Sequence, residues 1–205
     1  MALELLALTG ARAMDVHAGQ ESAFHLACAG GHLDVVRELL SLTGHRRVDV
    51  NAAGGRAFLN VHRNGHLLEV RELLKLTGDR AVDVHATAGD EAAFLVACAN
   101  GHLSIVRGLL SLTGSREVDV HAEREEGLLA ARHGGHTEVV CELLALTGHR
   151  AADVNYDQHN YFDQGLLEAC SEGHFQIVLQ LLAITGENRV DVNFDREVAF
   201  RTACA

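Results

Sequence analysis

The chain has 205 residues, 48% of them apolar, so it is long enough to bury a substantial core. Its 28 acidic and 17 basic residues give a formal net charge of -11, which repels phosphate backbones and anionic membrane surfaces and excludes nucleic acid as a general partner. No apolar run approaches the ~20 residues that cross a bilayer, and the first ten residues lack the basic start of a secretion signal. We therefore expect a soluble intracellular protein, with the cytoplasm as its compartment and its cysteines as free thiols.

A ten-residue phrase recurs along the chain and sets its organisation. It reads LTGHRRVDVN at residues 42–51, and the spacings between successive copies of its glycine are 34, 34, 36, 34 and 38 residues. The length varies only after the DV pair, where exposed loops tolerate insertions at low entropic cost. We interpret residues 1–205 as a single array with partial repeats at 1–14 and 191–205. The five full repeats, numbered 1 to 5, are 15–48, 49–82, 83–118, 119–152 and 153–190.

Each full repeat predicts the same elements in the same order. In repeat 1, ESAFHLACAGG (residues 21–31) predicts a short helix, and its acidic first residue suits the positive end of a helix. HLDVVRELLSLTG (residues 32–44) predicts a second helix with a broad apolar face, which Gly44 stops. Residues 48–50 then extend to the next repeat. Because one helix pair cannot bury both faces alone, the repeats must stack, which predicts an all-α helical-repeat solenoid with short extended connectors.

The order AFHLACAGGHLDVVRELL, residues 23–40, and the period together resemble the ankyrin repeat family across essentially the whole chain. The family's Thr-Pro pair is replaced, by Ser22-Ala23 in repeat 1, and the connector after the second helix is longer than the family norm. We therefore expect no well-formed hairpin fingers. The resemblance implies an ankyrin-like solenoid that recognises proteins through its tips and the concave face of its first helices, and it implies no enzyme.

The histidines belong mostly to repeated columns. One column holds either histidine or asparagine, and its members are His17, Asn51, His85, His121, Asn155 and Asn193. Exchange of histidine for an amide fits a hydrogen-bonding role better than a zinc ligand. We therefore predict structural histidines, with no metal and no cofactor. Cys141, the most exposed thiol expected, has no base at a helical neighbour position, so we predict no catalytic residues.

The phrase also repeats an arginine three residues before an aspartate, as at Arg80 and Asp83. We expect these pairs to form a ladder that fixes the connector, although an exposed pair is worth only ~0–1 kcal/mol. The rival interpretation is a basic stripe for an acidic ligand. Because an aspartate accompanies each arginine, we favour the ladder and interpret the phrase as a joint between repeats.

Specificity is expected where the repeats differ. The longest insertion, residues 155–163, contains Tyr156, His159, Tyr161 and Phe162. Exposed aromatic side chains are typical interface anchors, so these residues are the first candidate partner-binding site. The alternative is that Phe162 and one tyrosine fold onto the neighbouring repeat.

Two further candidate sites are charged. The segments ATAGDE (residues 86–91) and AEREEG (residues 122–127) predict an acidic edge that steers a basic peptide or protein, with a plain solvated edge as the alternative. Its residues are Asp90, Glu91, Glu123, Glu125 and Glu126. In repeat 2, His62 and Arg63 replace small or apolar residues, and Glu69 occupies a column of valine and isoleucine. The alternative there is a decayed repeat of low stability.

The chain begins within a second helix and ends within a first helix, so neither end has the polar cap of a solenoid. We expect a fragment of a longer array, or self-association end to end. The leading hypothesis is a non-enzymatic scaffold that binds a protein or peptide through the connector tips and the helix-one face. The alternative is a structural spacer or end-to-end assembly unit.

Overall fold

The computed structural model describes residues 15–86, 91–151 and 169–183, and the regular elements within these ranges are all helical. The chain divides into two compact blocks. The first block comprises Met1–Val96 and Leu112–Val118, and the second comprises Ala97–Ser111 and Asp119–Ala205. Each block is described separately.

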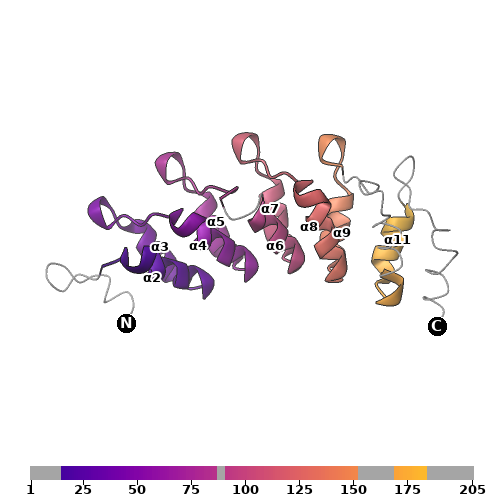
Figure 1. Ribbon diagram of the computed structural model, residues 1–205, viewed down its shortest axis with the longest axis horizontal. Coiled ribbons are helices and arrows are strands. Elements are labelled where there is room, and N and C mark those ends of the chain that lie inside the picture. The colour runs from indigo at the N-terminus through magenta and orange to yellow at the C-terminus, as the bar shows by residue number, and fades with distance from the viewer. Residues whose placement is uncertain (1–14, 87–90, 152–168, 184–205) are drawn as a thin grey trace. The chain divides into compact units, whose positions relative to one another are not determined.

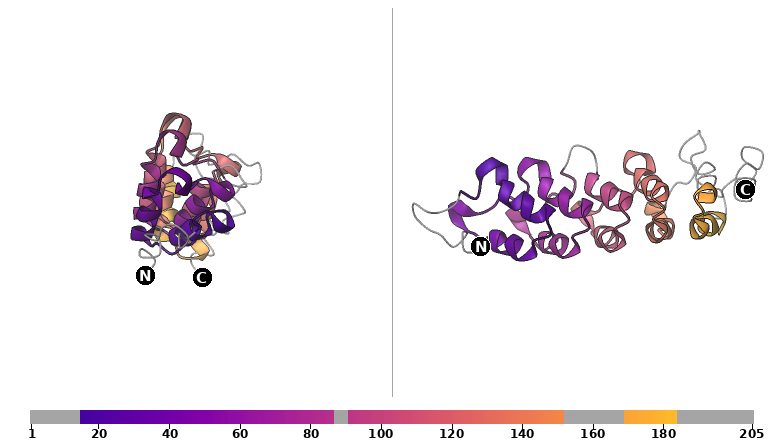
Figure 2. Two further views of the ribbon diagram at one scale, coloured as in Figure 1. Left: turned by 90° about the vertical axis from the view of Figure 1, so that its left-hand side faces the viewer. Right: turned by 90° about the horizontal axis from the view of Figure 1, so that it is seen from below.

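The first block contains the helix pairs of repeats 1 and 2. In repeat 1, α2 (Ala18–Ala29) and α3 (Leu33–Ser41) precede the 3-10 turn η2 (Gly44–Arg46). In repeat 2, α4 (Ala52–Arg63) and α5 (Leu67–Leu74) precede η3 (Gly78–Arg80). Helix α2 packs on α3 and α4, and α5 packs on α3 and α4, so the two pairs lie side by side (Figures 1 and 2). The turn η4 (Gly114–Arg116) belongs to this block too.

The second block repeats the arrangement. Helix α6 (Ala92–Ala99) crosses the boundary between the blocks, and α7 (Leu103–Leu110) follows it. Repeat 4 contributes α8 (Ala122–His133), α9 (Thr137–Leu144) and η5 (Gly148–Arg150), and repeat 5 contributes α11 (Phe175–Ala183). Helix α9 packs against α7, α8 and α11. Stacked helix pairs in each block make this a helical-repeat solenoid, as the sequence predicted.

The core consists of columns that recur once per repeat. Phe24 and Phe58 in the first helices are at most 1% exposed, and so are Val36 and Leu39 in the second helix of repeat 1. These positions follow the predicted helical period, so each helix presents its apolar stripe to its neighbours. The equivalent buried residues of the second helices are Val70, Leu73, Val106, Leu109, Val140 and Leu143.

Histidines of the glycine–histidine pairs tie the first helices together. His66 Nε2 lies 3.0 Å from the carbonyl oxygen of Ala29, at the end of the preceding first helix. Its ring also covers Gly31, where a Cβ would lie 2.6 Å from His66 Nδ1 and where φ is +66°. Position 31 therefore requires glycine both for its backbone conformation and for the close approach of the ring. His136 makes the same 3.0 Å contact with the carbonyl oxygen of Ala99 in the second block.

The connectors differ from the prediction in one detail. Gly44 has φ of +62°, as expected for a helix stop, but α3 already ends at Ser41 and Leu42 is extended. Gly44 instead begins η2, a turn that projects beyond the helices of its block (Figure 1). Within the described residues the connectors are thus 3-10 turns and extended segments rather than β-hairpins, as the long connector predicted.

Candidate functional site

A left-handed turn opens the first helix of several repeats. In repeat 1, Gly19, Gln20 and Glu21 have φ of +62°, +57° and +63°, and in repeat 4 Glu123, Arg124 and Glu125 have φ of +49°, +63° and +64°. An L-residue other than glycine pays about 1–2 kcal/mol for this conformation. The turn carries the third side chain away from the surface, and Glu21 and Glu125 are each only 4% exposed.

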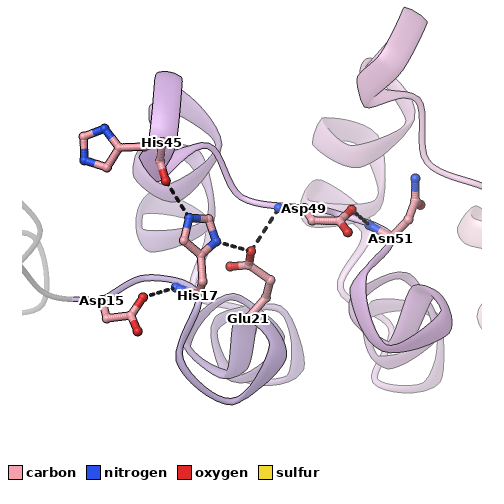
Figure 3. A network of polar contacts seen from close by, with 6 residues as sticks. All are labelled: Asp15, His17, Glu21, His45, Asp49 and Asn51. Atoms are coloured by element: carbon pink, nitrogen blue, oxygen red, sulfur yellow. Dashed lines mark hydrogen bonds and ion pairs between the residues drawn. The ribbon is translucent and has the colours of Figure 1, made fainter.

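The buried glutamate meets a histidine and the next repeat (Figure 3). His17 Nδ1 lies 2.6 Å from Glu21 Oε1, and His17 Nε2 lies 2.8 Å from the carbonyl oxygen of His45 in η2. Glu21 Oε1 also accepts the backbone N–H of Asp49 at 3.2 Å. One histidine–glutamate pair thus connects the start of α2 to the tip of its own repeat, through His45, and to the start of the following repeat, through Asp49. We call this arrangement a His–Glu joint.

Two more His–Glu joints have the same geometry. In the first block, His85 Nδ1 lies 2.7 Å from Glu91 Oε1, and His85 Nε2 lies 3.1 Å from the carbonyl oxygen of Ser115. In the second block, His121 Nδ1 lies 2.5 Å from Glu125 Oε1, and His121 Nε2 lies 2.8 Å from the carbonyl oxygen of His149. The histidine therefore always bridges a buried carboxylate and a tip carbonyl.

In repeat 2, the side-chain amide of Asn51 replaces the histidine and makes the contacts to the connector. Asn51 Nδ2 donates to the carbonyl oxygen of Ala81 at 3.0 Å, and Asn51 Oδ1 accepts the N–H of Asp83 at 2.9 Å. Gly55 stands where repeats 1, 3 and 4 have glutamate, and a Cβ there would lie 2.8 Å from the carbonyl oxygen of Ala86. The hydrogen-bonding role predicted from the exchange of histidine and asparagine is confirmed for these residues.

The glutamates shift the titration of their histidines. The hydrogen bond to Glu21 raises the pKa of His17, and the His45 carbonyl acts in the same direction. The hydrogen bond to Glu125 likewise raises the pKa of His121. Burial acts to lower the pKa of His85, but the bonds to Glu91 and Ser115 outweigh it and the pKa is raised.

The predicted Arg/Asp ladder is wrong, because both members satisfy backbone groups. Arg80 Nη2 donates to the carbonyl oxygen of Leu40 at 2.9 Å. Leu40 lies near the end of α3, the second helix of the preceding repeat. Asp83 Oδ1 accepts the backbone N–H of His85 at 3.0 Å. A helix C-terminus offers unpaired carbonyls that cations favour, which explains the choice of arginine. Arg116 and Arg150 make equivalent bonds, to Leu74 at 3.2 Å and Leu110 at 2.9 Å.

The predicted acidic edge requires correction. Glu91 and Glu125 are each 4% exposed and belong to His–Glu joints, so they cannot line a solvated edge. Glu123 and Glu126 are exposed. Asp90 and the aromatic candidates of the insertion, Tyr156, His159, Tyr161 and Phe162, lie outside the described residues.

The candidate pair in repeat 2 is divided between the core and the surface. His62 is fully buried, with its Nδ1 2.6 Å from the carbonyl oxygen of Phe58 and the two rings 4.1 Å apart, so it cannot reach a partner. Arg63 is exposed. Glu69 is only 4% exposed, and it adds to the effect of burial in raising the pKa of Cys28 to about 12. Repeat 2 therefore carries the buried carboxylate that the sequence indicated.

Exposed apolar side chains form a surface that sequence reasoning missed. Phe175, Leu179 and Leu182 are 64%, 44% and 48% exposed, and their spacing places them on one face of α11. We call these three residues the α11 stripe. A signal was available, because Leu179 occupies the column in which repeats 1 to 3 carry arginine. On the helix-one side, Leu26 is 71% exposed.

Within the described ranges, no cluster of three or more histidine, cysteine, aspartate or glutamate side chains is placed to hold a metal ion. In the same part of the chain, no helix is long and apolar enough to cross a membrane.

Comparison with known families agrees with this geometry. Residues 24–123 match the family model described as ankyrin repeats, in three copies. These residues therefore carry ankyrin repeats, as the resemblance predicted. Ankyrin repeats generally mediate interactions between proteins and are typically not enzymes. Comparisons with curated proteins and with solved structures give no match.

Proposed function

We propose that the protein is a non-enzymatic scaffold that binds another protein through surfaces where its repeats differ. The observation that carries the proposal is the α11 stripe. Exposed apolar side chains that gather on one face mark interaction sites, because their contact with water is unfavourable until a partner covers them. The three side chains would supply the apolar centre of an interface, with polar neighbours as its rim.

Chain position and charge extend this proposal. The insertion that contains Tyr156, His159, Tyr161 and Phe162 immediately precedes repeat 5 helices in the sequence, so we include these residues in the same contact surface. The net charge of -11 and the exposed Glu123 and Glu126 favour a partner with a basic rim. Exposed Leu26 and Arg63 are the corresponding candidates on the helix-one face of the first block.

The test is capture of proteins by the immobilised full chain from a lysate of its source. Leu179→Arg restores the residue of repeats 1 to 3 and places a charge in the middle of the stripe. Leu68→Arg is the matched control, because Leu68 is 53% exposed on α5 and lies outside the proposed surface. We expect Leu179→Arg to lose a captured protein that the wild type and Leu68→Arg retain. Identical capture by all three forms contradicts the proposed surface.

A structural spacer or assembly unit is the second candidate, because an apolar stripe on a helical repeat also suits a second copy of the chain. Light scattering at increasing protein concentration separates the two functions. Growth in mass that Leu179→Arg abolishes favours assembly. A constant monomer mass contradicts assembly and leaves recognition of a different protein.

A further inference from the structure

We propose that the three His–Glu joints are pH-sensitive clips, in which His17, His85 and His121 hold the tip of their own repeat only while both ring nitrogens carry a proton. This inference is independent of the partner and of the binding surface proposed above. It concerns the fold itself, and it rests on the hydrogen-bonding groups that face each ring.

Each histidine faces two acceptors. Glu21 Oε1 lies 2.6 Å from His17 Nδ1, and the His45 carbonyl oxygen lies 2.8 Å from His17 Nε2. A carbonyl and an ionised carboxylate only accept hydrogen bonds, whereas a neutral imidazole has a single N–H. Both contacts are therefore hydrogen bonds only in the imidazolium form. When the proton leaves, one of them becomes a contact between two lone pairs.

The carboxylate of this pair has a second hydrogen-bond donor. Glu21 Oε1 accepts the N–H of Asp49 in addition to its contact with the histidine. In the second block, Arg150 lines a small cavity together with Glu125.

The neighbouring aspartates act in the same direction as the glutamates. Each histidine follows an aspartate by two residues, and the aspartates raise the histidine pKa by their charge. These are Asp15, Asp83 and Asp119. The tips that supply the carbonyls carry His45 and Arg46, Ser115 and Arg116, and His149 and Arg150. Arg116 and Arg150 donate hydrogen bonds to helix carbonyl oxygens, those of Leu74 and Leu110.

The sign of the pH dependence follows from the raised histidine pKa values. A histidine whose pKa is higher in the folded state stabilises the fold fully below its ordinary value of 6.5, and this stabilisation is lost as the pH rises through the folded value. The joints therefore loosen on the alkaline side of pH 6.5. Repeat 2 does not respond, because the Asn51 amide supplies its donor and acceptor at any pH.

Glutamine at all three glutamates provides the sharpest test. In Glu21→Gln/Glu91→Gln/Glu125→Gln, the amide can donate to Nδ1 of a neutral ring while Nε2–H still donates to the tip carbonyl, so the joint closes without a charge. We measure urea unfolding of the full chain at pH 6 and pH 9, and histidine titrations by NMR. The wild-type unfolding constant is expected to rise about tenfold over this interval, summed over three partly exposed joints. The glutamine variant should lose most of this rise.

A single-joint variant keeps the test valid if the triple variant does not fold. His17→Asn/Glu21→Gly copies repeat 2, and glycine suits the φ of +63° at position 21. It should remove part of the pH dependence and leave the titrations of His85 and His121 unchanged. The proposal is overturned if the wild type and the variants share one pH dependence, or if His17 and His121 titrate at or below 6.5.

Discussion

Helices α3 and α11 are second helices of different repeats, and they agree on one side and differ on the other. Leu39 and Leu181 occupy the same inward column, and each is 1% exposed. Outward, α3 carries Arg37, whose Nη2 lies 2.7 Å from Glu72 Oε1, whereas α11 carries Leu179 in that column. The comparison separates two kinds of constraint. Stacking constrains the inward residues of α3 and α11 to the same apolar column, and the outward residues are free to differ for recognition.

The inward side should respond equally in both helices. Leu39→Ala and Leu181→Ala each remove a buried side chain, and we expect each to cost about 2–5 kcal/mol of unfolding free energy. Urea denaturation followed by circular dichroism measures the loss. If Leu181→Ala proves nearly neutral, α11 does not share the packing constraint of α3, and the comparison fails.

Helix α5 extends the comparison, because one of its inward positions carries a charged residue instead of an apolar one. Glu69, 4% exposed, occupies the column of Ile177, which is fully buried in α11. We expect Glu69→Val to stabilise the protein by about 1–3 kcal/mol at neutral pH, since valine avoids the desolvation of a charge. The reciprocal Ile177→Glu should destabilise it. A loss of stability in Glu69→Val would mean that the carboxylate has a favourable partner in repeat 2.

The outward column of α11 should matter for binding and not for folding. Leu179→Arg is expected to change the unfolding free energy by less than about 0.5 kcal/mol, because the side chain lies on the surface. The same variant is expected to lose partner capture. Denaturation and capture on one preparation distinguish this result from simple unfolding, which would reduce both.

The smallest effect is expected for the outward pair of α3. Arg37→Leu introduces the residue that α11 has in this column. In the wild type, the hydrogen bond from Arg37 to Glu72 is the main cause of the lowered Glu72 pKa. Any stabilisation from this carboxylate is present above pH 4.5 and is lost as the pH falls through the lower folded value. We expect a small, salt-sensitive loss of stability in a double-mutant cycle with Glu72→Gln. A coupling that persists in high salt would contradict an exposed pair.

Local patterns account for the parts of the fold that were predicted. The apolar period that places Val36 and Leu39 on one face is contained within a single turn or two of helix, so the helix pairs and their order could be read directly. One column holds histidine in repeat 1 (His17) and asparagine in repeat 2 (Asn51). The two side chains share only their hydrogen-bond donor and acceptor groups, so the column predicted a hydrogen-bonding role.

The missed features depend on contacts between distant residues. Glu125 was expected on the surface, but it is buried by a left-handed turn through Glu123 and Arg124, residues that carry no local signal for φ above zero. Arg80 was paired with the aspartate three residues away, yet its acceptor is the carbonyl of Leu40 in the preceding repeat. His62 was proposed for a partner and lies instead in the core beside Phe58.

The sequence alone determined that the chain is an array of helix pairs and which column of each pair faces inward, because helical period and repeat length are local properties. Only the tertiary structure decided which polar groups meet across a joint, as His17, Glu21 and Asp49 do, and which outward side chains remain uncovered. Hydrogen-bond partners and solvent exposure depend on how neighbouring repeats dock, and no single repeat contains that information.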